Sequence, residues 1–206
     1  MKILISILIL IFTLQTWTKA DDISGFEMEG MSVGDSLLDH FHKDDIIKEL
    51  NSEYVYKYKS KFIKVGAGFG EGFHLIKKIN EYDDIGITLQ IDDKKYIIYG
   101  LSGRVFCDNG IDQCFAKQKK ITSDLKSFLG EIIDFDEWES SYKGDISRKS
   151  KVYGNDFKFK ETGDMISVTV YDYSDAFTKK TKFYDHTAVT IFTKKYYNFI
   201  QKEAYE

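Results

Sequence analysis

Two serines near the start of the chain stand in patterns that hydrolytic nucleophiles use. Ser32 is the central residue of Gly30-Met31-Ser32-Val33-Gly34, which matches the G-x-S-x-G pattern of a nucleophile elbow. In that architecture the serine follows several strand–helix units, whereas few residues precede Ser32 here. Ser32 also suits a helix N-cap, with Asp35 three residues later as its capping-box partner. We therefore interpret Ser32 as a helix cap.

The overlapping string Gly34-Asp35-Ser36-Leu37 resembles the first block of the GDSL hydrolase family. This resemblance implies a secreted esterase with a flavodoxin-like parallel sheet, in which Ser36 is the nucleophile and His186 the base. The chain departs from the family's D-x-x-H block, because Asp185 and His186 are adjacent. Adjacent side chains on an extended segment point to opposite faces, so Asp185 is badly placed to orient His186. An esterase that uses Ser36 and His186 is our alternative function.

The longer string from Glu29 to Leu37 is similar to the G-M-S-x-G-x-S opening of small exported modules. These modules resemble the outer-membrane-assembly lipoprotein BamE and β-lactamase-inhibitor proteins, and uncharacterised exported proteins of marine bacteria open their mature chains with nearly this string. The resemblance implies an exported protein in which a helical pair precedes an antiparallel meander.

The histidine and glycine patterns do not match those of metal-binding or phosphate-binding sites. His40 and His42 are two residues apart on a predicted helix, which places them on different sides and disfavours joint chelation. Gly66, Gly68, Gly70 and Gly72 alternate but lack the G-x-G-x-x-G spacing of a dinucleotide loop. We expect no metal and no cofactor, and we name these four glycines as a candidate binding loop.

The first twenty residues have the layout of a secretory signal peptide. Lys2 precedes an apolar run, and Thr18-Lys19-Ala20 ends in a small residue suited to cleavage. The run from Ile3 to Trp17 is shorter than the ~20 residues that span a bilayer. We predict residues 1–20 as a cleaved signal peptide, a periplasmic or secreted protein, and no stable membrane span afterwards.

Charge and cysteine content agree with that destination. The formal net charge is −4, and basic residues are scattered along the chain, so we expect no nucleic-acid partner. The two cysteines, Cys107 and Cys114, flank a short turn. An oxidising compartment, an even count and a spacing unlike C-x-x-C predict a structural disulfide between them.

The hydrophobic period predicts the order of helices and strands. Residues 33–50 follow a helical period, which predicts a helical hairpin or one bent helix. A period of two then predicts strands at 54–58, 62–65, 73–76, 87–91 and 96–106. A helix at 111–128 ending at Gly130 is followed by strands at 131–135, 152–159, 165–173 and 187–192, a polar loop at 140–150, and a terminal helix at 194–204.

Strands joined by turns pair antiparallel, so the predicted class is α+β. We expect one twisted antiparallel sheet with an N-terminal helical hairpin, a central helix and a C-terminal helix on one face. The chain has no proline, and no linker of Pro, Gly or Ser composition divides it. Residues 21–206 are therefore predicted as one domain, with two fused similar modules, broken near 130–150, as the alternative.

No complete catalytic constellation emerges from these patterns. We therefore predict a non-catalytic exported domain that binds a protein or envelope component through its sheet or its glycine-rich loop.

Overall fold

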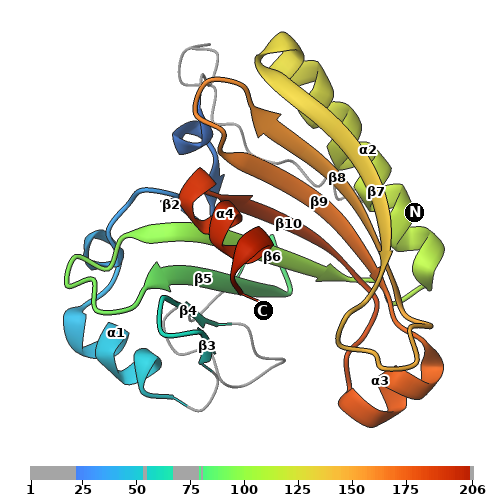
Figure 1. The fold of residues 1–206 in the computed structure, drawn as a ribbon, viewed down its shortest axis with the longest axis horizontal. Helices are drawn as coiled ribbons and strands as arrows, with labels where there is room; N and C mark the ends of the chain where they lie inside the picture. The colour runs from blue at the N-terminus through green and yellow to red at the C-terminus, as the bar shows by residue number, and fades with distance from the viewer. Residues whose placement is uncertain (1–21, 53–54, 67–78, 80, 205–206) are drawn as a thin grey trace, which may run out of the picture.

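An eight-stranded antiparallel sheet forms the centre of the computed structural model, which describes residues 22–52, 55–66, 79 and 81–204 (Figure 1). In space its strands follow the order β3-β4-β5-β6-β10-β9-β8-β7. Their bounds are β3 Tyr56–Tyr58, β4 Phe62–Val65, β5 Asp84–Gln90, β6 Ile98–Phe106, β7 Ile133–Ser141, β8 Lys151–Phe159, β9 Met165–Asp172 and β10 His186–Phe192. The predicted antiparallel α+β class is confirmed.

The sheet consists of two four-stranded meanders, β3 to β6 and β7 to β10, which join where β6 pairs with β10. Seven residue pairs align along this junction, from His186 opposite Phe106 to Phe192 opposite Gly100. Residues near 130–150, where the sequence allows a break between modules, include β7, which belongs to this same sheet.

Side-chain alternation gives the sheet two unlike faces. On β5, Ile85, Ile87 and Leu89 are buried in the main hydrophobic core, whereas Asp84 and Thr88 point to the opposite side. We call these sides the apolar face and the polar face.

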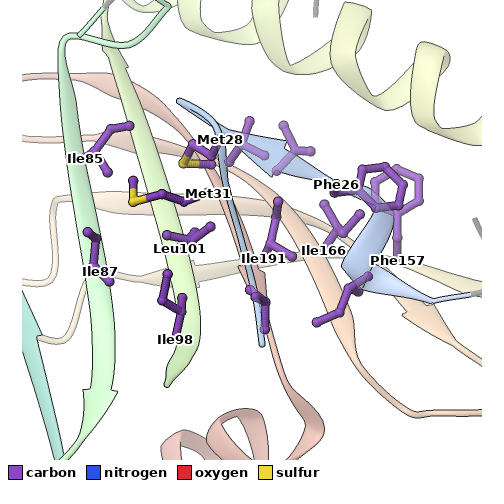
Figure 2. Close-up of a cluster of buried hydrophobic side chains, with 14 of the residues drawn as sticks. Phe26, Met28, Met31, Ile85, Ile87, Ile98, Leu101, Phe157, Ile166 and Ile191 are labelled. Carbon is purple, nitrogen blue, oxygen red and sulfur yellow. The ribbon is translucent and has the colours of Figure 1, made fainter. Parts of the chain in front are cut away.

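A short N-terminal hairpin lies over the apolar face (Figure 2). It is formed by β1 Glu27–Met28 and β2 Met31–Ser32. Phe26, Met28 and Met31 are almost fully buried. Figure 2 shows them packed among Ile85, Ile87, Ile98, Leu101, Phe157, Ile166 and Ile191. Burying a side chain of this size stabilises a fold by about 1.5–3 kcal/mol, so this cluster is a main source of stability.

Helix α2, Ile111–Leu129, covers the β9 and β10 side of the apolar face. Its buried residues recur at helical spacing, as the sequence predicts, and include Leu125 and Leu129. The buried Gln118 donates from Nε2 to the carbonyl oxygens of Tyr153 at 2.8 Å and Val168 at 2.9 Å. Gly130 ends the helix with φ +56°, and the 3-10 turn η3, Gly130–Ile132, leads into β7.

Helix α4, Lys194–Lys202, lies on the polar face, so the prediction that the helices gather on one face is wrong. Its Phe199 ring lies 4.9 Å from that of Phe62, on the side of β4 opposite the buried Ile63. On β10, Thr187 bonds to α2 while Phe192 stacks on Tyr197 of α4. The side-chain period does not encode which face of the sheet a terminal helix will cover, because both faces offer apolar positions.

The predicted N-terminal helical hairpin is also wrong. Residues 33–50 form only the 3-10 turn η2, Leu37–Asp39, and the short helix α1, Lys43–Leu50. The backbone of residues 34–37 bonds to the end of the β5–β6 hairpin, with Gly34 N donating to Ile98 O at 2.9 Å and Leu37 N to Tyr96 O at 3.0 Å. These long-range bonds replace the helical ones, and Gly34 adopts φ +101°.

Most remaining elements agree with the sequence, with two exceptions. Strand β7, Ile133–Ser141, is longer than the predicted strand at 131–135 and includes the first two residues of the predicted loop at 140–150, because the pairing with β8 continues to Ser141. Helix α3, Asp175–Thr181, lies where no element was predicted. The predicted strand at 73–76 and the predicted signal peptide at 1–20 lie outside the described residues, so both stay predictions. No helix in the described part of the chain is long and apolar enough to cross a bilayer.

The predicted disulfide is confirmed. Cys107, just after β6, bonds to Cys114 in the first turns of α2, with the two Cα atoms 5.7 Å apart. The bond fixes the start of α2 against the end of the central strand β6.

Removing the disulfide should destabilise the fold measurably. Closing a loop of about eight residues contributes about 2.5 kcal/mol in the chain-entropy model. We expect the double variant Cys107→Ser/Cys114→Ser to lose about that much free energy of unfolding in urea titrations, with reduced wild type as the matched control. A count of two free thiols in unfolded, unreduced wild type would contradict the assignment.

Candidate functional site

A cluster of charged side chains lies on the polar face of the sheet. Arg104 of β6 and Asp84 of β5 are direct neighbours in the strand register and form an ion pair. Both side chains are largely buried, with 15% and 6% of their surface exposed. Lys64 of β4 lies near both, because each contributes to its electrostatic environment. Two cations thus share one carboxylate, which leaves the cluster with net positive charge.

Burial disfavours the charged forms of Lys64 and Asp84. Desolvation, with the Arg104 guanidinium as a second cause, lowers the pKa of Lys64 to about 8. Desolvation also raises the pKa of Asp84 to about 6, although Arg104 and Lys64 both favour its ionised form. At neutral pH, both side chains are still mainly charged.

A glycine makes room for the lysine. A methyl group on Gly86 would overlap the Cε atom of Lys64, so the lysine side chain lies directly across the backbone of β5. Gly154 accommodates the ring of Trp138 on the same face in the same way. Glycine in these strands therefore serves the placement of large side chains from neighbouring strands.

His186 extends the cluster toward one end of the sheet. Its Nδ1 lies 2.9 Å from the carbonyl oxygen of Tyr184, which can only accept, so Nδ1 carries the proton and Nε2 is an acceptor. The imidazole stacks on the Tyr171 ring at 4.6 Å. Desolvation, with smaller effects from Arg104 and Lys64, lowers the pKa of His186 to about 4. The histidine is therefore neutral at pH 7.

An aromatic cluster connects His186 with helix α3. The rings of Tyr173 and Tyr142 lie 5.2 Å apart, and those of Tyr173 and Phe177 are stacked at 5.4 Å. Burial raises the pKa of Tyr173 far above its ordinary value, and its hydroxyl bonds to that of Tyr142. These phenols stay neutral hydrogen-bonding groups.

The loop from Tyr142 to Ser150, between β7 and β8, is held rigidly by Asp145. The carboxylate accepts hydrogen bonds from the backbone N–H and hydroxyl of Ser147, at 2.9 and 2.7 Å, and from those of Ser150, at 3.0 and 2.7 Å. These bonds hold the pKa of Asp145 well below its usual range. Ser174, the N-cap of α3, donates to the same carboxylate at 3.3 Å, so the loop and α3 form one unit.

A pocket of about 570 Å³ opens beside α3, where β6 ends and β10 begins. Its volume is within the range of small-ligand sites. Aromatic rings and carboxylates dominate its wall, which is formed by Phe106, Cys107, Asp108, Tyr173, Asp175, Thr178, Lys179, Tyr184 and Asp185. Three carboxylates face one lysine there. Burial raises the pKa of Asp185, and the nearby Asp172 and Asp175 raise it further.

The structure does not bring Ser36 and His186 together. Ser36 bridges to Ile97 just before β6, whereas His186 pairs with Phe106 at the opposite end of that strand. Nine residues of strand separate the two positions, roughly 30 Å at ~3.3 Å per residue. The sheet is also antiparallel, unlike the parallel sheet that the GDSL resemblance implies.

Among the other residues singled out from the sequence, the two serines have structural roles and most of the glycines lie outside the described residues. Ser36, not Ser32, is the N-cap, because its Oγ accepts from Leu38 N at 3.1 Å and donates to Lys95 O at 2.6 Å. Ser32 lies on β2, and its backbone N–H donates to Asp35. Gly66 follows β4 with φ +75°, while Gly68, Gly70 and Gly72 lie outside the described residues.

Within the described ranges, no three His, Cys, Asp or Glu side chains are grouped to hold a metal ion.

Sequence reasoning missed Lys64, Asp84 and Arg104. A usable signal was present, because Lys64 and Arg104 interrupt otherwise apolar or small-residue strands.

Replacing Ser36 should affect stability and not reactivity. The Ser36→Ala variant loses a cap and a hydrogen bond, so we expect about 1 kcal/mol less free energy of unfolding in urea. Wild type and variant should show equal background with a fluorophosphonate probe. Labelling that disappears only in the variant would identify a reactive serine and contradict this interpretation.

The low pKa of His186 predicts a pH-dependent contribution to stability. In the unfolded chain the imidazole binds a proton below pH 6.5, whereas the folded protein binds it only near pH 4. Stability from this residue is therefore complete above pH 6.5 and falls, by on the order of 3 kcal/mol, as the pH drops to 4. Asp84 acts in the opposite direction over part of this window, so the whole-protein curve alone is not diagnostic.

The difference between wild type and His186→Gln in urea titrations from pH 7 to 4.5 isolates the histidine. We expect the wild type to lose more stability than the variant over that range. NMR titration of the imidazole gives a direct check, and a pKa at or above 6.5 would contradict the assignment.

Comparisons with known proteins give no relative for this arrangement. No family model, no curated protein and no solved structure matches the chain, so the predicted resemblance to exported modules is neither supported nor contradicted.

Proposed function

We propose that this protein is a non-catalytic exported binding domain whose pocket beside α3 takes an organic cation. The cation is an ammonium or guanidinium group carried by a partner protein or another envelope component. One observation carries the proposal: the pocket combines aromatic rings with an excess of carboxylates.

The aromatic rings suit a cation because their faces carry negative potential. An ammonium or guanidinium within about 6 Å of such a ring gains on the order of 0.5–2 kcal/mol. Phe106, Tyr173 and Tyr184 line the pocket, and the Tyr184 side chain is 52% exposed. A ligand can therefore reach an aromatic surface without a rearrangement of the core.

The carboxylates of the pocket also favour a positively charged ligand. Asp108, Asp175 and Asp185 outnumber Lys179 in the wall of the pocket. Burial, and to a smaller extent Asp172 and Asp175, raise the pKa of Asp185, although Tyr173 N donates a hydrogen bond to its carboxylate. A bound cation would favour the ionised carboxylate and lower this pKa.

Ser36, the candidate nucleophile of the alternative function, is fully engaged elsewhere. Its hydroxyl hydrogen is donated to Lys95 O, and the same oxygen caps η2. An activated serine needs its proton directed at a base. The geometry therefore supports binding better than ester hydrolysis.

Titration with small model cations tests the proposal. We expect n-butylammonium and n-butylguanidinium to shift the amide resonances of Thr178 and Tyr184 in NMR spectra, with n-butanol and n-butyrate as size-matched controls. Asp175→Asn should weaken the cation response roughly 5-fold, a loss of about 1 kcal/mol of charge interaction.

Asp44→Asn is the matched control for that variant. Asp44 is also an exposed aspartate in the first turn of a helix, but that helix is α1. Equal shifts with n-butyrate and n-butylammonium, or an equal effect of the two variants, would refute the cation pocket.

A further inference from the structure

The loop between β7 and β8 presents the most exposed large apolar side chain in the described part of the molecule. Ile146 is 94% exposed, whereas the other exposed large apolar side chains range from 38% to 56%. Single exposed apolar residues are common on protein surfaces. Ile146 differs because its surroundings fix its position and its charge environment.

The position is fixed by the Asp145 network. The residues on both sides of Ile146 are held, since Asp145 and Ser147 bond to each other through side chain and backbone. The backbone N–H of Arg148 donates to Asp145 O at 2.9 Å, and Asp145 N donates to Tyr142 O at 3.1 Å. Ile146 therefore stands at the tip of a closed turn that is anchored to α3, and little conformational entropy remains to be lost on binding.

The loop that carries Ile146 has an excess of positive charge. Lys143, Arg148 and Lys149 are exposed on the same loop. The only acid of the loop, Asp145, is buried with its carboxylate directed to the two serines. The loop thus shows three cations and one isoleucine to solvent, on a chain whose formal net charge is −4. Helix α3, to which the loop is attached, carries Asp175 in its first turn and Lys179 and Lys180 in its last turn, so it adds little to the net charge of the loop.

From these contacts we propose that the loop from Tyr142 to Ser150 docks the protein on an anionic lipid bilayer, with Ile146 inserted among the acyl chains and Lys143, Arg148 and Lys149 at the headgroups. A bilayer accepts a single protruding side chain without a matching cavity, whereas a protein partner would need a socket of complementary shape. Binding at a bilayer surface needs apolar burial and attraction to anionic lipids. The apolar tip supplies the first, and the basic side chains beside it supply the second. This site is separate from the cation pocket and does not depend on it.

A tryptophan at the tip reports on insertion directly. In Ile146→Trp the side chain is exposed, so the fold should be retained, which an unchanged urea midpoint will verify. We expect vesicles of phosphatidylcholine and phosphatidylglycerol with brominated acyl chains to quench the added fluorescence beyond the quenching seen in wild type. Vesicles of brominated phosphatidylcholine alone should quench it much less. Because the signal comes from position 146, binding through another part of the full chain does not mimic it.

Charge variants in the Ile146→Trp background complete the test. Arg148→Gln/Lys149→Gln should raise the lipid concentration for half-maximal quenching roughly 25-fold, because each basic residue contributes about 5-fold near an anionic surface. Lys119→Gln/Lys120→Gln removes the same charge from exposed positions on α2 and should have little effect. Absence of excess quenching with anionic vesicles, or an equal effect of the two charge variants, would overturn the proposal. If anionic vesicles give no excess quenching, Ile146 would instead fit a cavity on a partner protein.

Discussion

The antiparallel pairing of β6 with β10 is the constraint on which the rest of the structure depends. It joins the two meanders into one sheet and sets the direction of every other strand. As a result β6, β7 and β9 all finish at the same end, where the disulfide turn, the loop from Tyr142 to Ser150 and α3 follow them. Helix α2 starts at that end and must return to the far end before β7 begins. Its 19 residues span roughly 28 Å at ~1.5 Å each, about the length of a nine-residue strand.

The two faces of this single sheet differ in what they contribute to the protein. The apolar face is covered by the N-terminal hairpin and α2, so it supplies most of the hydrophobic stabilisation. The polar face carries Lys64, Asp84 and Arg104, whose burial shifts the first two toward their neutral forms. A buried ion pair under these conditions contributes little net stability, because desolvation offsets the attraction. Groups perturbed in this way are enriched where proteins bind or react, so the polar face is a candidate functional surface.

The sequence predicts the elements of this fold better than their arrangement. The period of two in β8 and β9 and the helical period of α2 are local properties, and each was sufficient to place its element. The N-terminal segment failed because residues 34–37 bond to the β5–β6 hairpin about sixty residues away, which no local pattern reveals. Helix α3 was missed because its seven residues include no fully buried one, and so leave no periodic signal. The pocket combines residues from the end of β6, from α3 and from the segments that join α3 to β9 and β10, and only the register of the sheet brings them together.

The pocket and the Ile146 loop both adjoin α3, and the pocket is rich in carboxylates whereas the loop is rich in cations. Carboxylates of the pocket repel an anionic bilayer, while the cations of the loop are attracted to it, and each force decays over a Debye length of about 8 Å at physiological salt. A cation bound in the pocket would neutralise part of the repulsion without touching the loop. If both sites operate, cation binding and bilayer docking must therefore favour each other, and linkage requires the effect to be equal in both directions. The rigid attachment of the loop to Ser174 of α3 keeps the two sites at a fixed separation, so this coupling is electrostatic and needs no conformational change.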